Sequence, residues 1–300
     1  MSKIIKIVMW IVPIGYILSN NIGWSQENSK KEFVLKGWEY AVEMIQSGEC
    51  NYTIKKEQKW YEHPPSVSKP GFFKKEDYEK VPYTKEKKET YNCCWKYKRG
   101  KEVVEYIKKT YEKGQGKIYC DGEKYVEIQD KQILITPVGI QNLGIYSVTP
   151  PSSVLFHFWP GVSVKKIFSS GKIELKKVEY VNNQKCYPLV YRPSDYKDIG
   201  YTFWISEENF LPAKIETKIG STITIVSTIS YTKIGDIWFP QKFIGYTEIK
   251  GEKNAVVEIE YTNIKVNNEI SDKIFEPEFQ PGMNVYDRIT NTRFTVPEKK

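Results

Sequence analysis

Residues 200–296 carry the clearest pattern in the chain, with aromatic and β-branched side chains on alternating positions between turn residues. A period of two is typical of strands that bury one face. The breaks fall about 8–12 residues apart, the spacing expected of consecutive hairpins. We therefore expect an antiparallel meander with one face to bury, containing Tyr201–Ile205, Leu211–Lys218, Ile223–Tyr231 and Ile237–Phe243.

The same alternation recurs earlier in the chain, so the fold class is expected to be mainly β with a few helices. Turn pairs Arg99-Gly100, Asp121-Gly122 and Asn182-Asn183 separate predicted strands. The stretch from Ser66 to Lys88 is rich in proline and charge and is predicted to be a long loop. The expected strands are Asn51–Tyr61, Glu89–Lys98, Glu102–Tyr111, Lys117–Cys120, Tyr125–Ile128, Gln132–Thr136, Ile173–Tyr180 and Lys185–Tyr191.

One amphipathic helix is predicted from Ser29 to Gly48. Ser29-Lys30-Lys31-Glu32 has the form of a capping box, and Gly48 is suited to the position after a helix end. Apolar residues then recur at helical spacing, which predicts a helix that covers the sheet. These residues are Phe33, Trp38, Ala41, Val42 and Ile45. A second cover is expected at Ser152–Trp159, an aromatic segment between prolines.

The N-terminus resembles a secretory signal. Lys3 and Lys6 precede the apolar run 7–18, and small residues frame a cleavage point after Ser25. A retained membrane anchor is the alternative, but the run is shorter than the ~20 residues that span a bilayer. We expect a signal peptide at 1–25, a single domain at 26–300, and location in the periplasm.

Charge and cysteine content narrow the class of protein further. Cleavage removes two lysines and no acids, which lowers the formal charge from +8 to +6. Lysine and glutamate are interleaved along the chain, so no basic stripe indicates nucleic-acid binding. Export makes disulfides plausible, and we expect buried thiols with one structural disulfide. The five cysteines are Cys50, Cys93, Cys94, Cys120 and Cys186.

Catalytic and cofactor motifs are missing from the sequence. There is no GxSxG, HExxH, P-loop or dinucleotide fingerprint, and no metal-binding cysteine pair. Only two histidines exist, His63 and His157, and neither has an obvious carboxylate or metal-ligand partner. Glu207 and Glu208 lie in a predicted turn, where exposure to solvent accounts for two adjacent carboxylates without a catalytic role. We therefore expect a binding protein rather than an enzyme, without cofactor or metal.

Several hairpins resemble those of the outer-membrane lipoprotein-sorting carriers, the LolA/LolB-like proteins. The resemblance covers about residues 30–296. It implies a strongly curved antiparallel sheet, an unclosed β-barrel, with helices covering the concave face. The segments that carry it are Phe203–Glu216, Tyr231–Pro240, Val178–Tyr187, an early hairpin at Asp121-Gly122, and Phe275–Asp287.

The resemblance also implies a function, in which the concave apolar sheet holds a lipid or lipoprotein acyl chain for transport across the periplasm. Envelope membrane proteins would be its further partners. The alternative is a periplasmic sensor or scaffold of the same fold that binds another protein through the loop Ser66–Lys88. Candidate residues lining the acyl-chain site are Trp38, Phe156, Phe158, Trp159, Phe203, Trp238 and Phe243.

Overall fold

The computed structural model describes residues 26–61, 83–109, 114–137, 164 and 168–298. Sixteen strands form one sheet, and helix α1 spans Gln26–Glu43. No helix within these ranges is long and apolar enough to cross a bilayer. The strands are β1 (Ser47–Tyr61), β2 (Tyr83–Lys98), β3 (Lys101–Lys108), β4 (Gly114–Cys120), β5 (Lys124–Gln129), β6 (Gln132–Pro137), β7 (Gly171–Leu175), β8 (Glu179–Val181), β9 (Gln184–Pro193), β10 (Ile199–Ser206), β11 (Pro212–Ile219), β12 (Ile223–Ile234), β13 (Ile237–Ile249), β14 (Glu252–Val266), β15 (Asn284–Asp287) and β16 (Thr292–Thr295).

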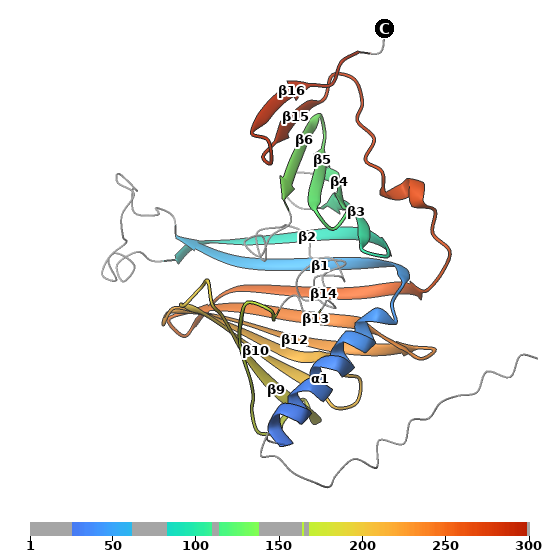
Figure 1. Cartoon of the computed structure of the whole chain (residues 1–300). Coiled ribbons are helices and arrows are strands. Elements are labelled where there is room, and N and C mark those ends of the chain that lie inside the picture. The colour runs from blue at the N-terminus through green and yellow to red at the C-terminus, as the bar shows by residue number, and fades with distance from the viewer. Residues whose placement is uncertain (1–25, 62–82, 110–113, 138–163, 165–167, 299–300) are drawn as a thin grey trace, which may run out of the picture.

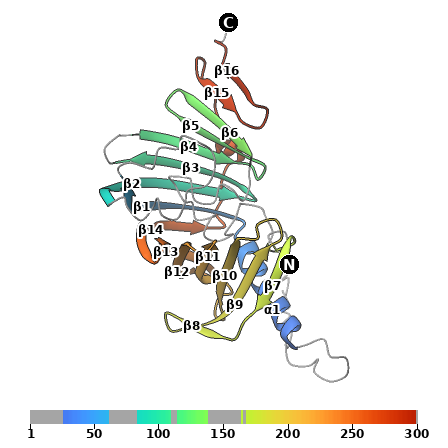
Figure 2. The same cartoon turned by 90° about the vertical axis from the view of Figure 1, so that its left-hand side faces the viewer.

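The sheet is curved and not closed, which confirms the expected fold class (Figures 1 and 2). Its spatial order is β16-β15-β6-β5-β4-β3-β2-β1-β14-β13-β12-β11-β10-β9-β7, and β8 pairs with β9. The run from β14 back to β9 is the antiparallel meander that the alternation predicted. Strand β1 lies in the middle of the sheet, between β2 and β14.

Two-residue turns join several neighbouring strands where the sequence predicted them. Arg99 and Gly100 have φ of 46° and 85°, and Asn182 and Asn183 have 49° and 64°. Two successive positive φ values define the type I′ turn, whose twist matches that of the flanking strands. At Asp121-Gly122 the hairpin is also present, but Glu123 extends the connection to three residues.

Helix α1 packs its apolar stripe on one face of the sheet, which we call the concave face. Val34, Trp38, Val42 and Ile45 are buried in one cluster with the inward side chains of the central strands and of β9–β13. Phe33 departs from the predicted stripe, since it is 44% exposed. The helix crosses in front of β9 and β10 in Figure 1. The sheet therefore has a covered apolar face, as the pattern predicted.

Both predicted ends of this helix are wrong. The helix begins at Gln26, so Ser29 lies inside it rather than at its cap. Gln26 and Glu27 are good helix formers, and this preference extends the helix upstream. The helix ends at Glu43, and Gly48 belongs to β1. A Cβ on Gly48 would come within 3.2 Å of the Trp95 ring and 3.3 Å of the Lys265 carbonyl oxygen, so glycine serves close packing there.

The C-terminal segment does not continue the meander, contrary to the expectation for residues 200–296. After β14 the chain passes through a short 3₁₀ helix, η3 (Asp272–Phe275), and β15 then pairs in parallel with β6. Ile270, Phe275, Met283 and Val285 form a second core on the face opposite α1. This core buries the outward residues Val103, Tyr119, Val126 and Ile133 of β3–β6.

The predicted long loop is shorter than expected at its C-terminal end. Strand β2 begins at Tyr83 and pairs with β1 from there on, so residues 83–88 are strand rather than loop. Lysine and glutamate alternate across this pair, for example in the ion pair of Lys88 with Glu57 at 3.1 Å. The high density of charged residues at 83–88 therefore led to a wrong prediction of loop, because these side chains form cross-strand ion pairs. The rest of the proposed partner loop lies outside the described residues.

The expected disulfide is also wrong, because all five cysteines are free thiols. Cys93 and Cys94 point to opposite faces, as adjacency on a strand requires. Cys50 faces the same core as Cys93 but pairs across the strands with Trp95. Cys120 lies on β4 and Cys186 on β9, each away from the others in the strand order.

Candidate functional site

The part of the apolar face beneath α1 is an aromatic cluster. Trp38 and Phe203 are both fully buried, and their ring centroids lie 5.3 Å apart. Phe168 contacts both rings, at 5.8 Å and 5.7 Å, and meets Tyr191 edge to face at 4.9 Å. Edge-to-face packing orients aromatic rings more strictly than area burial alone. These contacts dock the helix on β9 and β10.

Of the predicted lining residues, the structure places four in one hydrophobic cluster. Trp38 and Phe203 are at its core, while Trp238 and Phe243 are partly buried and pack against it. Phe156, Phe158 and Trp159 lie outside the described residues, as does the rest of the expected second cover. Four members of the predicted set therefore belong to one large hydrophobic cluster, and within it the rings of Trp38 and Phe203 are in contact.

Sequence reasoning missed other members of this face. Phe239, next to Trp238, is fully buried and lies 5.8 Å from the fully buried Trp95. Tyr52 and Tyr261 face each other across β1 and β14, with ring centroids 5.5 Å apart. The alternation Tyr91-Cys93-Trp95-Tyr97 was the available signal for β2, since all four are buried on this face.

Three buried polar atoms interrupt the apolar surface. The Trp38 Nε1 and the Tyr261 hydroxyl have no hydrogen-bond partner among the described residues. The Tyr52 hydroxyl lies beside the Cys93 thiol. Burial raises the pKa of Tyr52 and Tyr261 far above the ordinary phenol value, so both remain hydrogen-bond donors. An unmet buried donor costs about 1–3 kcal/mol, which a ligand carbonyl or hydroxyl would recover.

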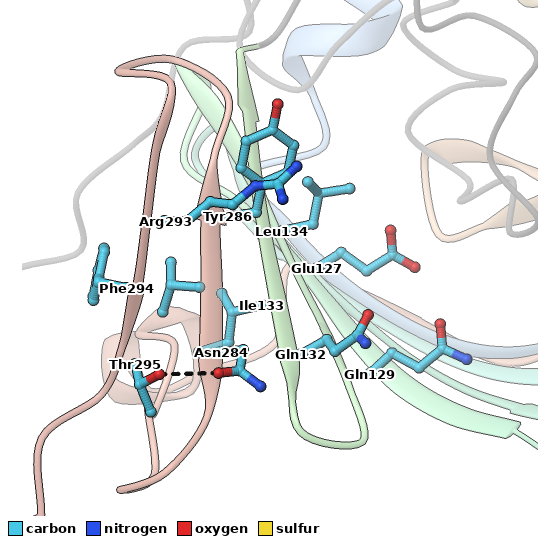
Figure 3. A pocket seen from close by; sticks show the side chains of 11 residues that line it. Glu127, Gln129, Gln132, Ile133, Leu134, Asn284, Tyr286, Arg293, Phe294 and Thr295 are labelled. Atoms are coloured by element: carbon cyan, nitrogen blue, oxygen red, sulfur yellow. Dashed lines mark hydrogen bonds between the residues drawn. The ribbon is translucent and has the colours of Figure 1, made fainter.

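A separate open pocket of about 540 Å³ lies near the edge of the sheet that the last two strands of the chain, β15 and β16, form (Figure 3). Its walls are β5, β6 and the hairpin β15–β16, with side-chain amides from Gln129, Gln132 and Asn284. The Arg293 guanidinium lies 4.5 Å from the centroid of the Tyr286 ring. This pocket is lined by both polar and apolar side chains, and it lies at the opposite end of the strand order from β9 and β10.

Groups that could catalyse a reaction or bind a metal are sparse in the described chain. His63 and His157 both fall outside it. Within it, no three histidine, cysteine or carboxylate side chains are grouped as metal ligands.

Comparisons with known proteins identify similar folds. A family model with the description "Uncharacterized protein" matches residues 166–279. No curated protein matches the chain in sequence. A LolA superfamily protein from Nitrosomonas europaea is similar at TM-score 0.49 and 16% identity, over 83% of this chain and 98% of that one.

Two further solved structures complete this comparison. A domain described as an outer membrane lipoprotein-sorting protein, from Vibrio parahaemolyticus, has TM-score 0.47 and 10% identity, over 83% of this chain and 94% of that one. The MucA/MucB complex of Pseudomonas aeruginosa has TM-score 0.29 and 9% identity, over 83% of this chain and 61% of the matched one. All three TM-scores are below 0.5, and the fold is therefore defined by this chain's own strand order.

Proposed function

We propose that this protein holds the acyl chain of a lipid or lipoprotein against its concave face and carries it across the periplasm. It acts as a binding protein rather than an enzyme. The observation that carries the proposal is the continuous apolar face, in which aromatic side chains from β1, β2, β10, β13 and α1 form one cluster. The Tyr261 hydroxyl, which has no hydrogen-bond partner among the described residues, supplies a donor for an ester carbonyl within it.

Acyl-chain burial supplies enough free energy for such a carrier. Each buried methylene contributes about 0.8 kcal/mol, so a 16-carbon chain offers roughly 12 kcal/mol before costs. Association and ordering remove about 4–15 kcal/mol of any gross gain. The net affinity is therefore modest, which suits a protein that must also release its cargo.

Entry of the chain is expected to displace a cover. Helix α1 is the candidate, since it lies on the apolar face through side-chain packing and is joined to β1 only at its C-terminal end. The segment Ser152–Trp159 is the second candidate proposed from the sequence. Phe158→Asp is expected to abolish lipid uptake while leaving the sheet folded, and unchanged binding of a fluorescent fatty acid would remove that segment from the site.

The first test is to identify the cargo. The full-length chain is expressed in a Gram-negative host and purified from the periplasm without detergent. Native mass spectrometry and organic extraction then measure bound lipid. About one lipid per chain supports the proposal and identifies the cargo class. Protein that is empty and also refuses added fatty acid, monoacylglycerol and triacylated lipopeptide overturns it.

A pair of variants on β13 tests where the lipid binds. Phe243 is partly buried in the concave cluster, and the next residue, Ile244, is 39% exposed. Phe243→Asp is expected to weaken binding of a fluorescent fatty acid at least tenfold, because a charge then faces the acyl chain. Ile244→Asp adds the same negative charge at the neighbouring position, on the outward side of β13. This variant is expected to leave binding unchanged. Equal effects of the two variants would place the lipid elsewhere.

The second candidate function is a sensor or scaffold that binds an envelope protein. One feature favours it: β16 is the edge of the sheet, and Phe294 on it is 51% exposed. An edge strand offers unpaired backbone groups to a partner strand. A photo-crosslinking residue at position 294 would capture that partner in intact cells, whereas crosslinks to lipid or to nothing would count against this candidate.

A further inference from the structure

The pocket beside β15 and β16 has a floor built from four neighbouring strands. Asn284 on β15 stands opposite Gln132 on β6 and, on its other side, opposite Thr295 on β16. Gln132 in turn stands opposite Gln129 on β5. Figure 3 shows these side chains side by side across the strands. We call Gln129, Gln132, Asn284 and Thr295 the polar row.

The polar row differs in chemistry from exposed rows elsewhere on the sheet. Ion pairs of lysine with glutamate join β1 to β2, β3 to β4 and β13 to β14, for example Lys117 with Glu105 at 2.8 Å. The polar row contains no charged side chain, and three of its four members are amides. A side-chain amide both donates and accepts hydrogen bonds, so the row suits a ligand that also does both.

Most hydrogen-bonding groups of the polar row are available to a ligand. The Asn284 Oδ1 accepts from the Thr295 hydroxyl at 3.0 Å, which leaves the Asn284 Nδ2 as a donor. Within the ranges that the structure describes, no hydrogen bond joins the side-chain amide of Gln129 or Gln132 to another residue. The row therefore presents three side-chain amides to the pocket.

The pocket lining carries no net charge. A second row lies beside the polar row and consists of Glu127, Leu134, Tyr286 and Arg293. Glu127 and Arg293 stand at its two ends and are the two charged members of the described lining. The Tyr106 hydroxyl donates to Glu127 at 3.2 Å, while the Arg293 guanidinium lies 4.5 Å from the Tyr286 ring centroid. A ligand of large charge would meet as much repulsion as attraction here.

The size and position of the pocket suit a ligand that reaches it from solvent. Its volume of about 540 Å³ lies within the range of about 300–1,000 Å³ that is typical of small-molecule sites. Leu134 and the Tyr286 ring add apolar surface beside the amides. Tyr125, two residues before Glu127 on the same face of β5, belongs to the cluster that contains the buried side of α1. The pocket floor is therefore the polar end of the concave face.

We infer that this pocket binds a neutral oligosaccharide. Sugar hydroxyls donate and accept as the amides do, and the C–H faces of sugar rings match Leu134 and Tyr286. An extended peptide matches less closely, because strand-addition sites recognise alternate side chains through a series of pockets. Leu134 and Tyr286 are the apolar side chains of the two rows, and they stand opposite each other. This inference goes beyond the proposed lipid-binding function and does not rest on it.

An array of defined glycans tests the inference on the full-length chain. The array carries neutral oligomers of glucose, mannose, galactose and N-acetylglucosamine, together with anionic oligogalacturonate and a library of extended peptides. Wild-type protein is expected to bind at least one neutral oligomer. Titration calorimetry with that oligomer is expected to give equal affinities at low and high salt, since screening does not affect an uncharged ligand.

Variants of the polar row locate the binding. Gln129→Ala with Gln132→Ala is expected to weaken binding of that oligomer about tenfold, the effect of losing two neutral hydrogen bonds. Gln115→Ala with Gln184→Ala is the matched control, because both glutamines are exposed on strands outside the pocket. The control variant is expected to bind as wild type does. Since all four side chains are exposed, neither variant should unfold the sheet, and circular dichroism checks this.

The other outcomes overturn the inference. Binding to no neutral oligomer on the array does so directly, and equal binding by the polar-row variant places the glycan elsewhere. Preference for oligogalacturonate, with affinity that falls as salt rises, would make the pocket an anion site. Capture of extended peptides alone, lost in Gln129→Ala with Gln132→Ala, would make it a peptide site. None of these results bears on lipid binding, which Phe243→Asp tests separately.

Discussion

The ring of Phe210 lies directly on the backbone of Gly37, so close that a Cβ on this glycine would overlap the ring atoms. Phe210 sits in the turn between β10 and β11 with a φ of 56°, a conformation that costs a bulky residue about 1–2 kcal/mol. Its ring also meets Phe33 edge to face at 5.2 Å. The strained turn is therefore used to hold α1 against the sheet.

We predict that Gly37→Ala loosens this contact. The added methyl group forces the Phe210 ring away, which costs about 1–3 kcal/mol. Alanine returns about 1 kcal/mol as the better helix former. The net result is a lower free energy of unfolding in urea, together with faster proteolysis near the N-terminus of α1.

Gly200 on β10 is the control for this substitution. A Cβ there meets nothing within 4 Å, so Gly200→Ala is expected to stabilise by about 0.5–1 kcal/mol. A Gly37→Ala protein as stable as wild type would show that the ring moves without cost.

The Asn267 side chain forms hydrogen bonds with the residues that connect α1 to β1. We predict that removing this side chain destabilises the protein. Asn267 donates to the Met44 carbonyl at 3.0 Å and accepts from the Gln46 amide at 2.8 Å. Asn267→Ala is expected to lower the free energy of unfolding by about 1–2 kcal/mol, measured by urea denaturation. Since Asn267 has a φ of 54°, Asn263→Ala at φ 52° is the backbone control. Equal losses would attribute the effect to backbone strain alone.

The thiols are predicted to differ sharply in reactivity. Only Cys94 is partly exposed, and burial raises the pKa of Cys93 and Cys120 to about 12 and that of Cys186 to about 11. Reduced native protein should therefore show one fast phase with Ellman's reagent, from Cys94, and the remaining thiols only after unfolding. Cys94→Ser removes the fast phase and Cys120→Ser retains it. A fast phase that survives Cys94→Ser would contradict the burial of the others.

Acid stability is predicted to depend on Glu89. Its pKa is lowered to about 2 in the folded protein, because lysine hydrogen bonds overcome the effect of burial. The unfolded state takes up the proton first, so this contribution is present above the ordinary value of about 4.5 and is lost as the pH falls toward about 2. Melting temperatures across that window should fall less steeply for Glu89→Gln than for wild type. Glu86→Gln, at an exposed position on the other side of β2, should follow the wild-type slope.

Local features of the fold could be predicted from the sequence because they depend on neighbouring residues. The turns at Arg99-Gly100 and Asn182-Asn183 require positive φ, which their residue types tolerate. The burial of Trp38 and Phe203 followed from helical and strand periodicity. The parallel pairing of β15 with β6 could not be predicted, since no local pattern specifies which strand a distant segment joins.

The candidate site was predictable to the same limited extent. Periodicity identifies apolar positions on each strand but does not say which strands lie beneath the helix. Phe239 and Tyr261 were missed for this reason, although both are buried in the same cluster. The pairing of Lys56 with Glu89 had no sequence signature either, because the two residues become neighbours only through strand register.

Because β1 lies in the middle of the sheet, the sheet cannot be completed until β14, late in the sequence, pairs with it. Strands β2–β6 follow β1 as successive antiparallel neighbours, and β10–β14 form a second such series. The seam between β1 and β14 instead joins Gly48 to Val266, and both strands are 15 residues long. A chain emerging from N- to C-terminus therefore exposes one long edge of β1 until β14 has emerged. Truncation before β14 would leave that edge open to other strands, so such fragments should aggregate rather than persist as half-barrels.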